Sequence, residues 1–350
     1  MPYGDYNWPR RHFNSKKSHR NEIMRQQRLS STCINFMCLS LFILSTISLL
    51  GGCSSKDHPF AKYWPPKQGK YKSILDRQRQ GLPIEERPKK EPDLTAEEYE
   101  KLGDRYLQQG NMDESFIQYN KTLELNPGQN GVRYKVGLLF LKRGLPDEAL
   151  KQFQKILEKD AGHALAYEGM GQAFMQKGKY DKAEKNFQKA LQLNSDLWLS
   201  HNGLGMIYDR KLRFDHAIAH YKAAINIKPD QYILLNNLGM SYYLNGKYKK
   251  SAETLLKAIE AGSDPKNAKV YNNLGLVLGK LDRYEEALEA FKKGGDRPTA
   301  YNNLGYCYFL QGKYEEAIAV FKKAIEIKPS FYPSANKNLK MAKKALEIEN

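Results

Sequence analysis

Cysteine is scarce in this chain of 350 residues, which contains only Cys33, Cys38, Cys53 and Cys307. The first three lie within or next to an apolar stretch and the fourth stands alone far downstream, so no framework of paired cysteines exists. Disulfide bonds therefore do not hold this fold together. The sequence also lacks a pairing of nucleophile and base, a phosphate-binding loop and a cluster of metal ligands. We therefore predict a protein that is not an enzyme and that carries no cofactor and no metal.

Acidic residues are too few to balance the basic ones, and the formal net charge is +17. Residues 1–52 contribute seven lysines and arginines against Asp5 and Glu22, so most of the excess lies further along the chain. Such a charge favours anionic partners, namely lipid headgroups, acidic proteins, nucleic acid or cell-wall polymers. Charge alone does not choose among them.

An apolar run, "INFMCLSLFILSTISLL", occupies residues 34–50 and follows basic Arg25 and Arg28. A basic start, an apolar run and small residues after it are typical of a secretory signal peptide. The ending, "LGGC" at residues 50–53, resembles a bacterial lipobox, which implies lipid attachment at Cys53 and cleavage before it. The alternative is an uncleaved anchor, although this run is a marginal membrane-spanning segment because polar residues interrupt it. Both interpretations place the rest of the chain outside the cytoplasm.

We therefore predict a lipoprotein signal peptide over residues 1–52, with Met24 as an alternative start because residues 1–23 are long and polar. Lipoproteins of this class that stay at the inner membrane commonly carry Asp after the cysteine, where this chain has Ser54. The resemblance thus implies the outer membrane, facing the periplasm, or the outer leaflet of the cytoplasmic membrane in a cell with only one membrane. Residues 53–93 are rich in proline and lysine, which predicts an extended, semi-rigid tether.

Beyond this tether, helix signals alternate with a fixed period. One glycine recurs at steps of 34, 34, 34, 34, 36 and 30 residues. Other residues, small at some positions and large at others, recur at fixed sequence distances from this glycine. In the last full unit they are Tyr301, Leu304, Gly305, Tyr308, Ala317, Phe321, Ala324 and Pro329, and the recurring glycines are Gly103, Gly137, Gly171, Gly205, Gly239, Gly275 and Gly305.

This spacing and these residues resemble the tetratricopeptide repeat. The resemblance implies an all-α fold, a right-handed α-solenoid of seven helix-turn-helix repeats over residues 94–329. Residues 330–350 are predicted to form a capping helix, because the last repeat needs a cover for its apolar face. The sixth repeat is four residues short, so we expect its second helix to end early at Gly294 and Gly295. Helix reversals with positive φ are predicted at Gly110, Gly144, Gly178, Gly246 and Gly312.

The sequence "NNLG" occurs three times, at residues 236–239, 272–275 and 302–305. In this family the asparagine positions face the concave surface formed by the stacked first helices. An amide both donates and accepts hydrogen bonds, so it can match the backbone of a bound peptide, while apolar neighbours contact its side chains. The alternative is that these amides only join adjacent repeats. The predicted groove consists of Asn236, Asn237, Met240, Tyr243, Asn272, Asn273, Leu276, Asn302, Asn303, Tyr306 and Phe309.

Two other features of the sequence are candidate sites. His216 and His220 have the spacing of a two-histidine metal site on a helix, but no third ligand is evident, so a solvated helix face is expected. Cys307 lies in the packed "LGYCYF" segment, which favours a small buried hydrophobic residue over a reactive thiol.

Over most of its length the chain is similar to tetratricopeptide lipoproteins that assist assembly of type IV or Flp-type pili, including pilotin-like proteins. The resemblance implies a scaffold that binds other envelope proteins, such as pilus or secretin-type ring subunits, and is attached to the membrane through its N-terminal lipid. An adaptor that docks cell-wall hydrolases or proteases is the alternative function. Export argues against nucleic acid, and no residues suggest a small-molecule substrate.

Overall fold

A computed structural model describes residues 94–262, 268–328 and 333–349. Every regular element in these ranges is a helix, and they contain no strand. The predicted all-α architecture is therefore confirmed. The predicted signal peptide and tether, including Cys53, lie outside the described residues. All described helices belong to the unit that spans residues 66–350.

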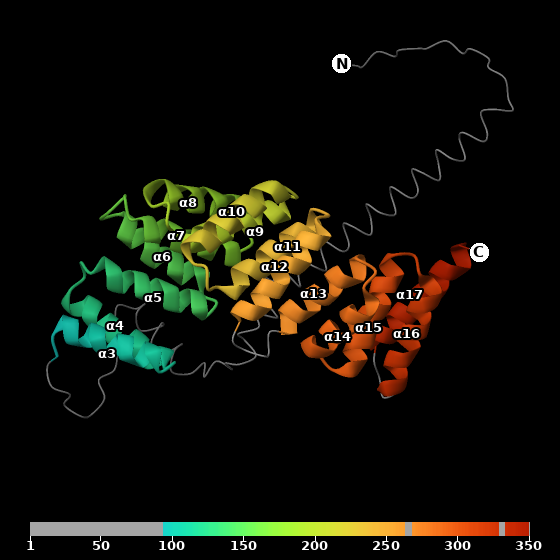
Figure 1. Cartoon of the computed structure of the whole chain (residues 1–350). Coiled ribbons are helices and arrows are strands. Elements are labelled where there is room, and N and C mark those ends of the chain that lie inside the picture. The colour runs from blue at the N-terminus through green and yellow to red at the C-terminus, as the bar shows by residue number, and fades with distance from the viewer. Residues whose placement is uncertain (1–93, 263–267, 329–332, 350) are drawn as a thin grey trace, which may run out of the picture. The chain divides into compact units, whose positions relative to one another are not determined.

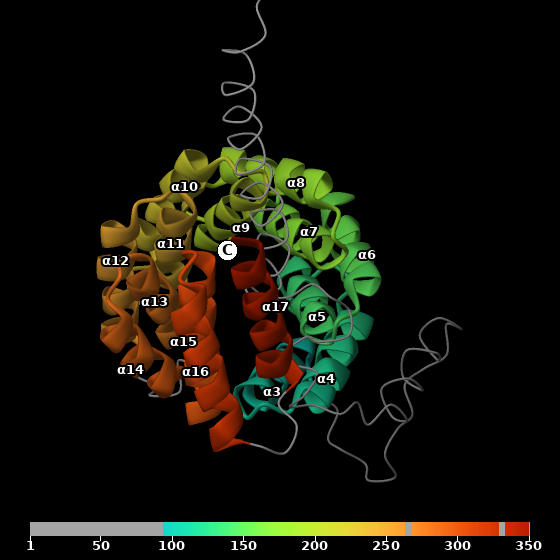
Figure 2. The ribbon, with the colours of Figure 1, turned by 90° about the vertical axis from the view of Figure 1, so that its right-hand side faces the viewer.

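The described helices form seven consecutive pairs followed by one last helix, and each pair packs on the next (Figure 1). Figure 2 shows that the first helices of the pairs line the inner side of this stack and the second helices its outer side. The first helices are α3 (Ala96–Gln108), α5 (Asn130–Lys142), α7 (Ala164–Gln176), α9 (Trp198–Arg210), α11 (Tyr232–Leu244), α13 (Ala268–Lys280) and α15 (Arg297–Leu310). The second helices are α4 (Met112–Leu125), α6 (Pro146–Leu157), α8 (Tyr180–Leu193), α10 (Phe214–Ile227), α12 (Tyr248–Ala261), α14 (Tyr284–Gly294) and α16 (Tyr314–Ile327), and α17 (Pro333–Glu349) ends the stack.

Within each pair, the recurring glycine permits close contact between the two helices. A Cβ atom added to Gly305 would lie 2.7 Å from the ring of Phe321, which is fully buried. Phe187 is held on both sides, because a Cβ on Gly171 or on Gly203 would lie 2.5 Å from its ring. No side chain fits at these points, and the rings therefore fix how closely the helices approach.

The turn within each pair requires a residue in the left-handed backbone region. The five glycines predicted there all have positive φ, which confirms that prediction. In two pairs a non-glycine residue takes the same place, namely Leu212 with φ 57° and Asp282 with φ 59°. Asp tolerates this region better than Leu does, so Leu212 is the more strained of the two.

The short second helix of the sixth pair and the helix that covers the last pair were both predicted from the sequence. Helix α14 has 11 residues and ends at Gly294, as predicted. The Nδ2 atom of Asn272 donates a hydrogen bond of 3.1 Å to the carbonyl oxygen of Gly294. Helix α17 covers the last pair, with Ala335 and Ala342 fully buried and Leu339 packed against the cluster around Phe321. Among the described residues, no helix has both the length and the apolar character needed to span a membrane.

We expect Leu212→Gly to stabilise the protein, because a left-handed conformation costs an L-residue about 1–2 kcal/mol. The side chain of Leu212 is half exposed, so little packing is lost, and the greater freedom of glycine in the unfolded chain removes about 0.5–1 kcal/mol of the gain. The midpoint of thermal unfolding, followed by circular dichroism, should rise. Gly246→Leu is the matched control, because it places leucine at the equivalent turn with φ 71° and should lower the midpoint. A lower midpoint for Leu212→Gly would show that the leucine side chain contributes more than its strain costs.

Candidate peptide-binding surface

The asparagines of the repeated motif form a chain of hydrogen bonds across three first helices. Asn237 donates from Nδ2 to Oδ1 of Asn202 over 3.0 Å, which joins α11 to α9. Asn273 donates from Nδ2 to Oδ1 of Asn236 over 2.8 Å, which joins α13 to α11. Asn236 in turn donates to Oδ1 of Asn237 over 3.4 Å. We call Asn202, Asn236, Asn237 and Asn273 the amide ladder.

A separate amide pair joins the capping helix to the last repeat, because Asn338 donates from Nδ2 to Oδ1 of Asn302 over 3.0 Å. Contact between adjacent repeats, the second interpretation of the motif, is therefore observed for Asn236, Asn237 and Asn273, whereas Asn302 contacts the capping helix. Asn202 and Asn338 lie outside the three copies of the motif. The segment "HNGLG" at residues 201–205 carried a signal for the first, since Asn202 has the register of Asn236.

The predicted groove residues differ in their exposure. Asn236, Met240 and Tyr243 lie deep in the inner wall, with 0 %, 2 % and 7 % of their surface exposed. The members that remain half-buried, and so within reach of a partner, are Asn272, Leu276, Asn303, Tyr306 and Phe309. The rings of Tyr306 and Phe309 stack with centroids 6.2 Å apart. Peptide binding by this half-buried set stays a prediction.

Helix α13 presents a row of these side chains on one face. Lys269, Leu276 and Lys280 are separated by seven and four residues, spacings that place them on the same side of a helix. Asn272 and Asn273 lie between them on this side. Burial lowers the pKa of both Lys269 and Lys280. We call Lys269, Asn272, Leu276 and Lys280 the α13 row.

Buried carboxyl groups join the middle repeats in the same way. Glu168 accepts hydrogen bonds at Oε2 from the backbone nitrogen and the hydroxyl of Ser200, over 3.0 and 2.9 Å. Asp209 accepts from the hydroxyl groups of Ser241 and Tyr221, over 2.7 and 2.9 Å. Burial raises the pKa of both groups, that of Asp209 to about 7. These contacts connect α7 to α9 and α9 to α11.

The inner wall of the first two repeats is charged, and its charges are paired. The Lys135 ammonium lies 2.8 Å from Oε1 of Glu100 and 2.7 Å from Oδ1 of Asp104. The hydroxyl of Tyr119 also donates to Asp104, over 2.5 Å. Burial alone would raise the pKa of Asp104, but these hydrogen bonds outweigh it and hold the pKa below its usual value. Because Lys135 is already neutralised, this part of the wall offers a partner less net charge than the α13 row.

The structure agrees with the sequence-based expectation for His216 and Cys307 but differs from it for His220. His216 is exposed, as expected, but His220 is half-buried, with its Nδ1 atom 2.9 Å from Nδ1 of His201. Cys307 is buried, as predicted, and burial raises the pKa of its thiol to about 12. A thiol with this pKa is not a nucleophile at neutral pH. In the part of the chain that the structure describes, no group of three or more histidine, cysteine or carboxylate side chains is placed to hold a metal ion.

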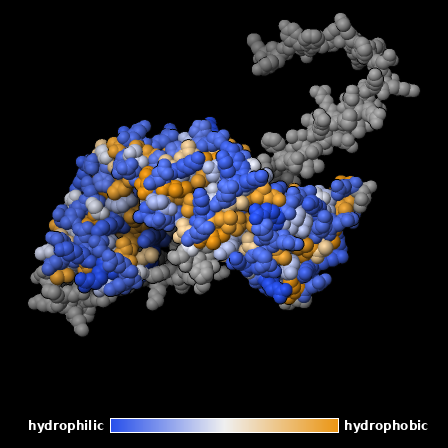
Figure 3. Space-filling model, in the orientation of Figure 1, coloured by the Kyte–Doolittle hydropathy of each residue, from blue (hydrophilic) through white to orange (hydrophobic). Residues whose placement is uncertain are grey.

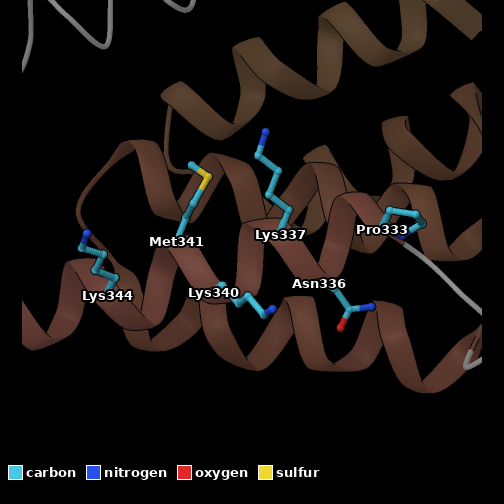
Figure 4. Close-up of a pocket in the computed structure, with 6 residues that line it drawn as sticks. All are labelled: Pro333, Asn336, Lys337, Lys340, Met341 and Lys344. Atoms are coloured by element: carbon cyan, nitrogen blue, oxygen red, sulfur yellow. The ribbon is translucent and has the colours of Figure 1, made fainter.

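The outer surface is mixed in character. Figure 3 shows apolar patches separated by larger hydrophilic areas on the face in view. A pocket of about 430 Å³ lies on the solvent side of α17, and Figure 4 shows the lysines and the single methionine around it. Among the described residues its lining comes from α17, and a polar outer face is what a solenoid cap requires for solubility, so we assign it no ligand. These described lining residues are Pro333, Asn336, Lys337, Lys340, Met341 and Lys344.

Comparison with known sequences agrees with the helix pairs. Sequence profiles of the tetratricopeptide repeat match residues 100–164, 164–197, 200–231, 230–294 and 298–331. Together these matches cover most of the described residues. No curated protein matches the chain.

Several solved structures match parts of this chain. The Cut9–Hcn1 assembly of the APC/C matches 79 % of this chain and 53 % of its own, with 19 % identity and a TM-score of 0.54. MamA matches 46 % of this chain and 94 % of its own, with 28 % identity and a TM-score of 0.39. Pseudomonas aeruginosa pilF matches 63 % and 97 %, with 18 % identity and a TM-score of 0.48.

The amide ladder predicts that Asn273→Ala destabilises the protein. The substitution leaves the buried Oδ1 of Asn236 without its donor, and an orphaned polar atom of this kind costs about 1–3 kcal/mol. Asn303→Ala is the matched control, since Asn303 is half-buried in the equivalent position and alanine is the better helix former. Thermal unfolding should show a lower midpoint for Asn273→Ala only. Equal midpoints for both variants would remove the structural role that we assign to the ladder.

Proposed function

The chain belongs to the tetratricopeptide-repeat family, and from this premise we propose that it is a lipid-anchored scaffold that binds other proteins of the bacterial envelope. The observation that carries the proposal is the half-buried surface formed by the α13 row together with Asn303, Tyr306 and Phe309. A repeat protein presents such an inner surface to extended or helical segments of its partners.

The apolar part of this surface spans two neighbouring repeats. Leu276 and Tyr306 each follow the recurring glycine, so they hold the same position on α13 and α15, which pack against each other. Phe309 lies one turn beyond Tyr306 and stacks on it. These side chains suit one or two large apolar residues of a partner, and the amide of Asn303 can bond the partner's backbone.

The charged part of the surface favours an acidic partner segment. Lys269 and Lys280 lie at the two ends of the α13 row, and burial lowers the pKa of each because a desolvated ammonium group is disfavoured. A carboxylate of the partner would offset that cost on binding. The preferred segment therefore carries acidic residues on both sides of a large apolar residue.

The envelope location rests on the N-terminal sequence. Export and lipid attachment at Cys53 follow from the resemblance of residues 50–53 to a lipobox, and Ser54 favours the outer membrane with the solenoid facing the periplasm. By its sequence resemblance to pilus-assembly lipoproteins, the scaffold helps a pilus or secretin-type ring subunit to localise or oligomerise. The alternative, an adaptor for cell-wall hydrolases or proteases, uses the same surface and differs only in the partner.

Affinity capture from detergent-solubilised envelopes tests the partner and the surface together. We expect the wild-type chain to retain pilus or ring subunits, and the Tyr306→Ala/Phe309→Ala variant to lose them while it stays folded by circular dichroism. Leu125→Ala is the control, because Leu125 is 59 % exposed on the outer helix α4. Recovery of hydrolases or proteases in their place would establish the alternative function. Equal capture by the Tyr306→Ala/Phe309→Ala variant and by the Leu125→Ala control would show that binding occurs elsewhere on the solenoid.

The anchoring proposal has its own test. Cys53→Ala removes the thiol that accepts the lipid, so the variant should incorporate no radioactive fatty acid and should keep its signal peptide. The matched control is Cys38→Ala, within the apolar run, which should be labelled like the wild type. Equal labelling of the Cys53→Ala variant would exclude lipid attachment at this residue.

A further inference from the structure

We propose that His201 of α9 and His220 of α10 form a binding site for a divalent transition-metal ion of the Cu²⁺ or Ni²⁺ type. Their Nδ1 atoms face each other at 2.9 Å, and their rings lie 5.2 Å apart between centroids. The two histidines come from different helices of one pair, so an ion bound between them would link α9 to α10. This site is independent of the peptide-binding surface.

The distance between the two nitrogens indicates which metal fits. Imidazole nitrogens bind such ions at about 2.0–2.1 Å, so two nitrogens 2.9 Å apart subtend an angle of about 90° at the ion. Tetrahedral coordination, which zinc prefers, would hold the nitrogens about 3.3–3.4 Å apart at the same bond lengths. An angle near 90° is that of square-planar or tetragonal sites, which are typical of Cu²⁺ and Ni²⁺. Water molecules would complete the coordination.

Both rings are in the form that binds metals. Burial lowers the pKa of His201, and burial together with the neighbouring histidines lowers that of His220 to about 4. The rings are therefore neutral at neutral pH, and protons compete little with a metal ion. In the metal-free pair one Nδ1–H donates to the other Nδ1. On binding, that proton moves to Nε2 of the same ring, so both Nδ1 lone pairs face the ion and the charge of the rings is unchanged.

Neighbouring groups hold the two rings in place, as outer contacts do at metal sites. The ring of Tyr208 stacks on His220 with centroids 5.4 Å apart and an angle of 12°. The backbone of Ser195 favours the protonated form of His201, although burial outweighs this effect and lowers the pKa. His216 lies one turn before His220 and also contacts Tyr208, but it is exposed to solvent. It therefore serves as a built-in control for the proposed pair.

The test is a titration of the untagged full-length chain with Cu²⁺ alone, followed by calorimetry and electron paramagnetic resonance. The double variant His201→Gln/His220→Gln gives the background from the remaining histidines, His12, His19, His58, His163 and His216. Above that background we expect one Cu²⁺ per chain, coupling to two nitrogens and a higher midpoint of thermal unfolding with the ion. His201→Gln and His220→Gln should each weaken binding at least about tenfold, whereas His216→Gln should change it less than about twofold.

Two results would overturn the proposal. The first is a wild-type chain that binds no more Cu²⁺ than the double variant. The second is loss of binding in His216→Gln but not in His201→Gln, which would assign the ion to the two histidines of α10. Circular dichroism of each variant without metal shows whether it is folded, and His201→Gln alone decides the question if His220→Gln does not fold, because His201 is required only by the site between the helices.

Discussion

The contact between a glycine of each first helix and a large side chain of its second helix sets the geometry on which the whole stack depends. In six of the seven described pairs that side chain is the ring of Tyr or Phe, and in the fifth pair it is Leu255. Any Cβ at the glycine would lie less than 3 Å from this side chain, so the two helices meet at one distance only. Because some rings, such as that of Phe187, also touch a glycine of the next pair, the same contact fixes how successive repeats stack.

Polar contacts between neighbouring repeats complete this arrangement. The amide ladder, the Glu168–Ser200 contact and the Asp209–Ser241 contact all connect a first helix to the first helix of the next repeat. Ion pairs also connect neighbouring repeats, such as Lys211–Asp181 between the third and fourth and Lys247–Asp215 between the fourth and fifth. A solenoid has only nearest-neighbour interfaces, so each repeat depends on bonds of this kind for its register.

The candidate binding surface lies where the repeat is least regular. Helix α14 is shortened, and Asn272 of the α13 row bonds to the carbonyl of its last residue, Gly294. Leu276 of α13 and Tyr306 of α15, both half-buried, come directly after the two glycines that contact Phe291 and Phe321. The packing that brings the helices together therefore also presents the surface, and the proposed histidine site of α9 and α10 stands apart from it.

The sequence by itself determined the helix pairs, the turns at Gly110 and its equivalents, the early end of α14 at Gly294 and the burial of Cys307, because each follows from local spacing and residue type. Only the tertiary structure decided the role of the asparagines. The spacing placed Asn237, Asn273 and Asn303 on the inner side alike, yet Asn273 is bonded to the preceding repeat and Asn303 is half-buried. The pairing of His201 with His220 could likewise not be predicted from the sequence, since these residues lie 19 positions apart on different helices. Such contacts depend on the angle at which two helices cross, and the residue pattern within either helix does not determine that angle.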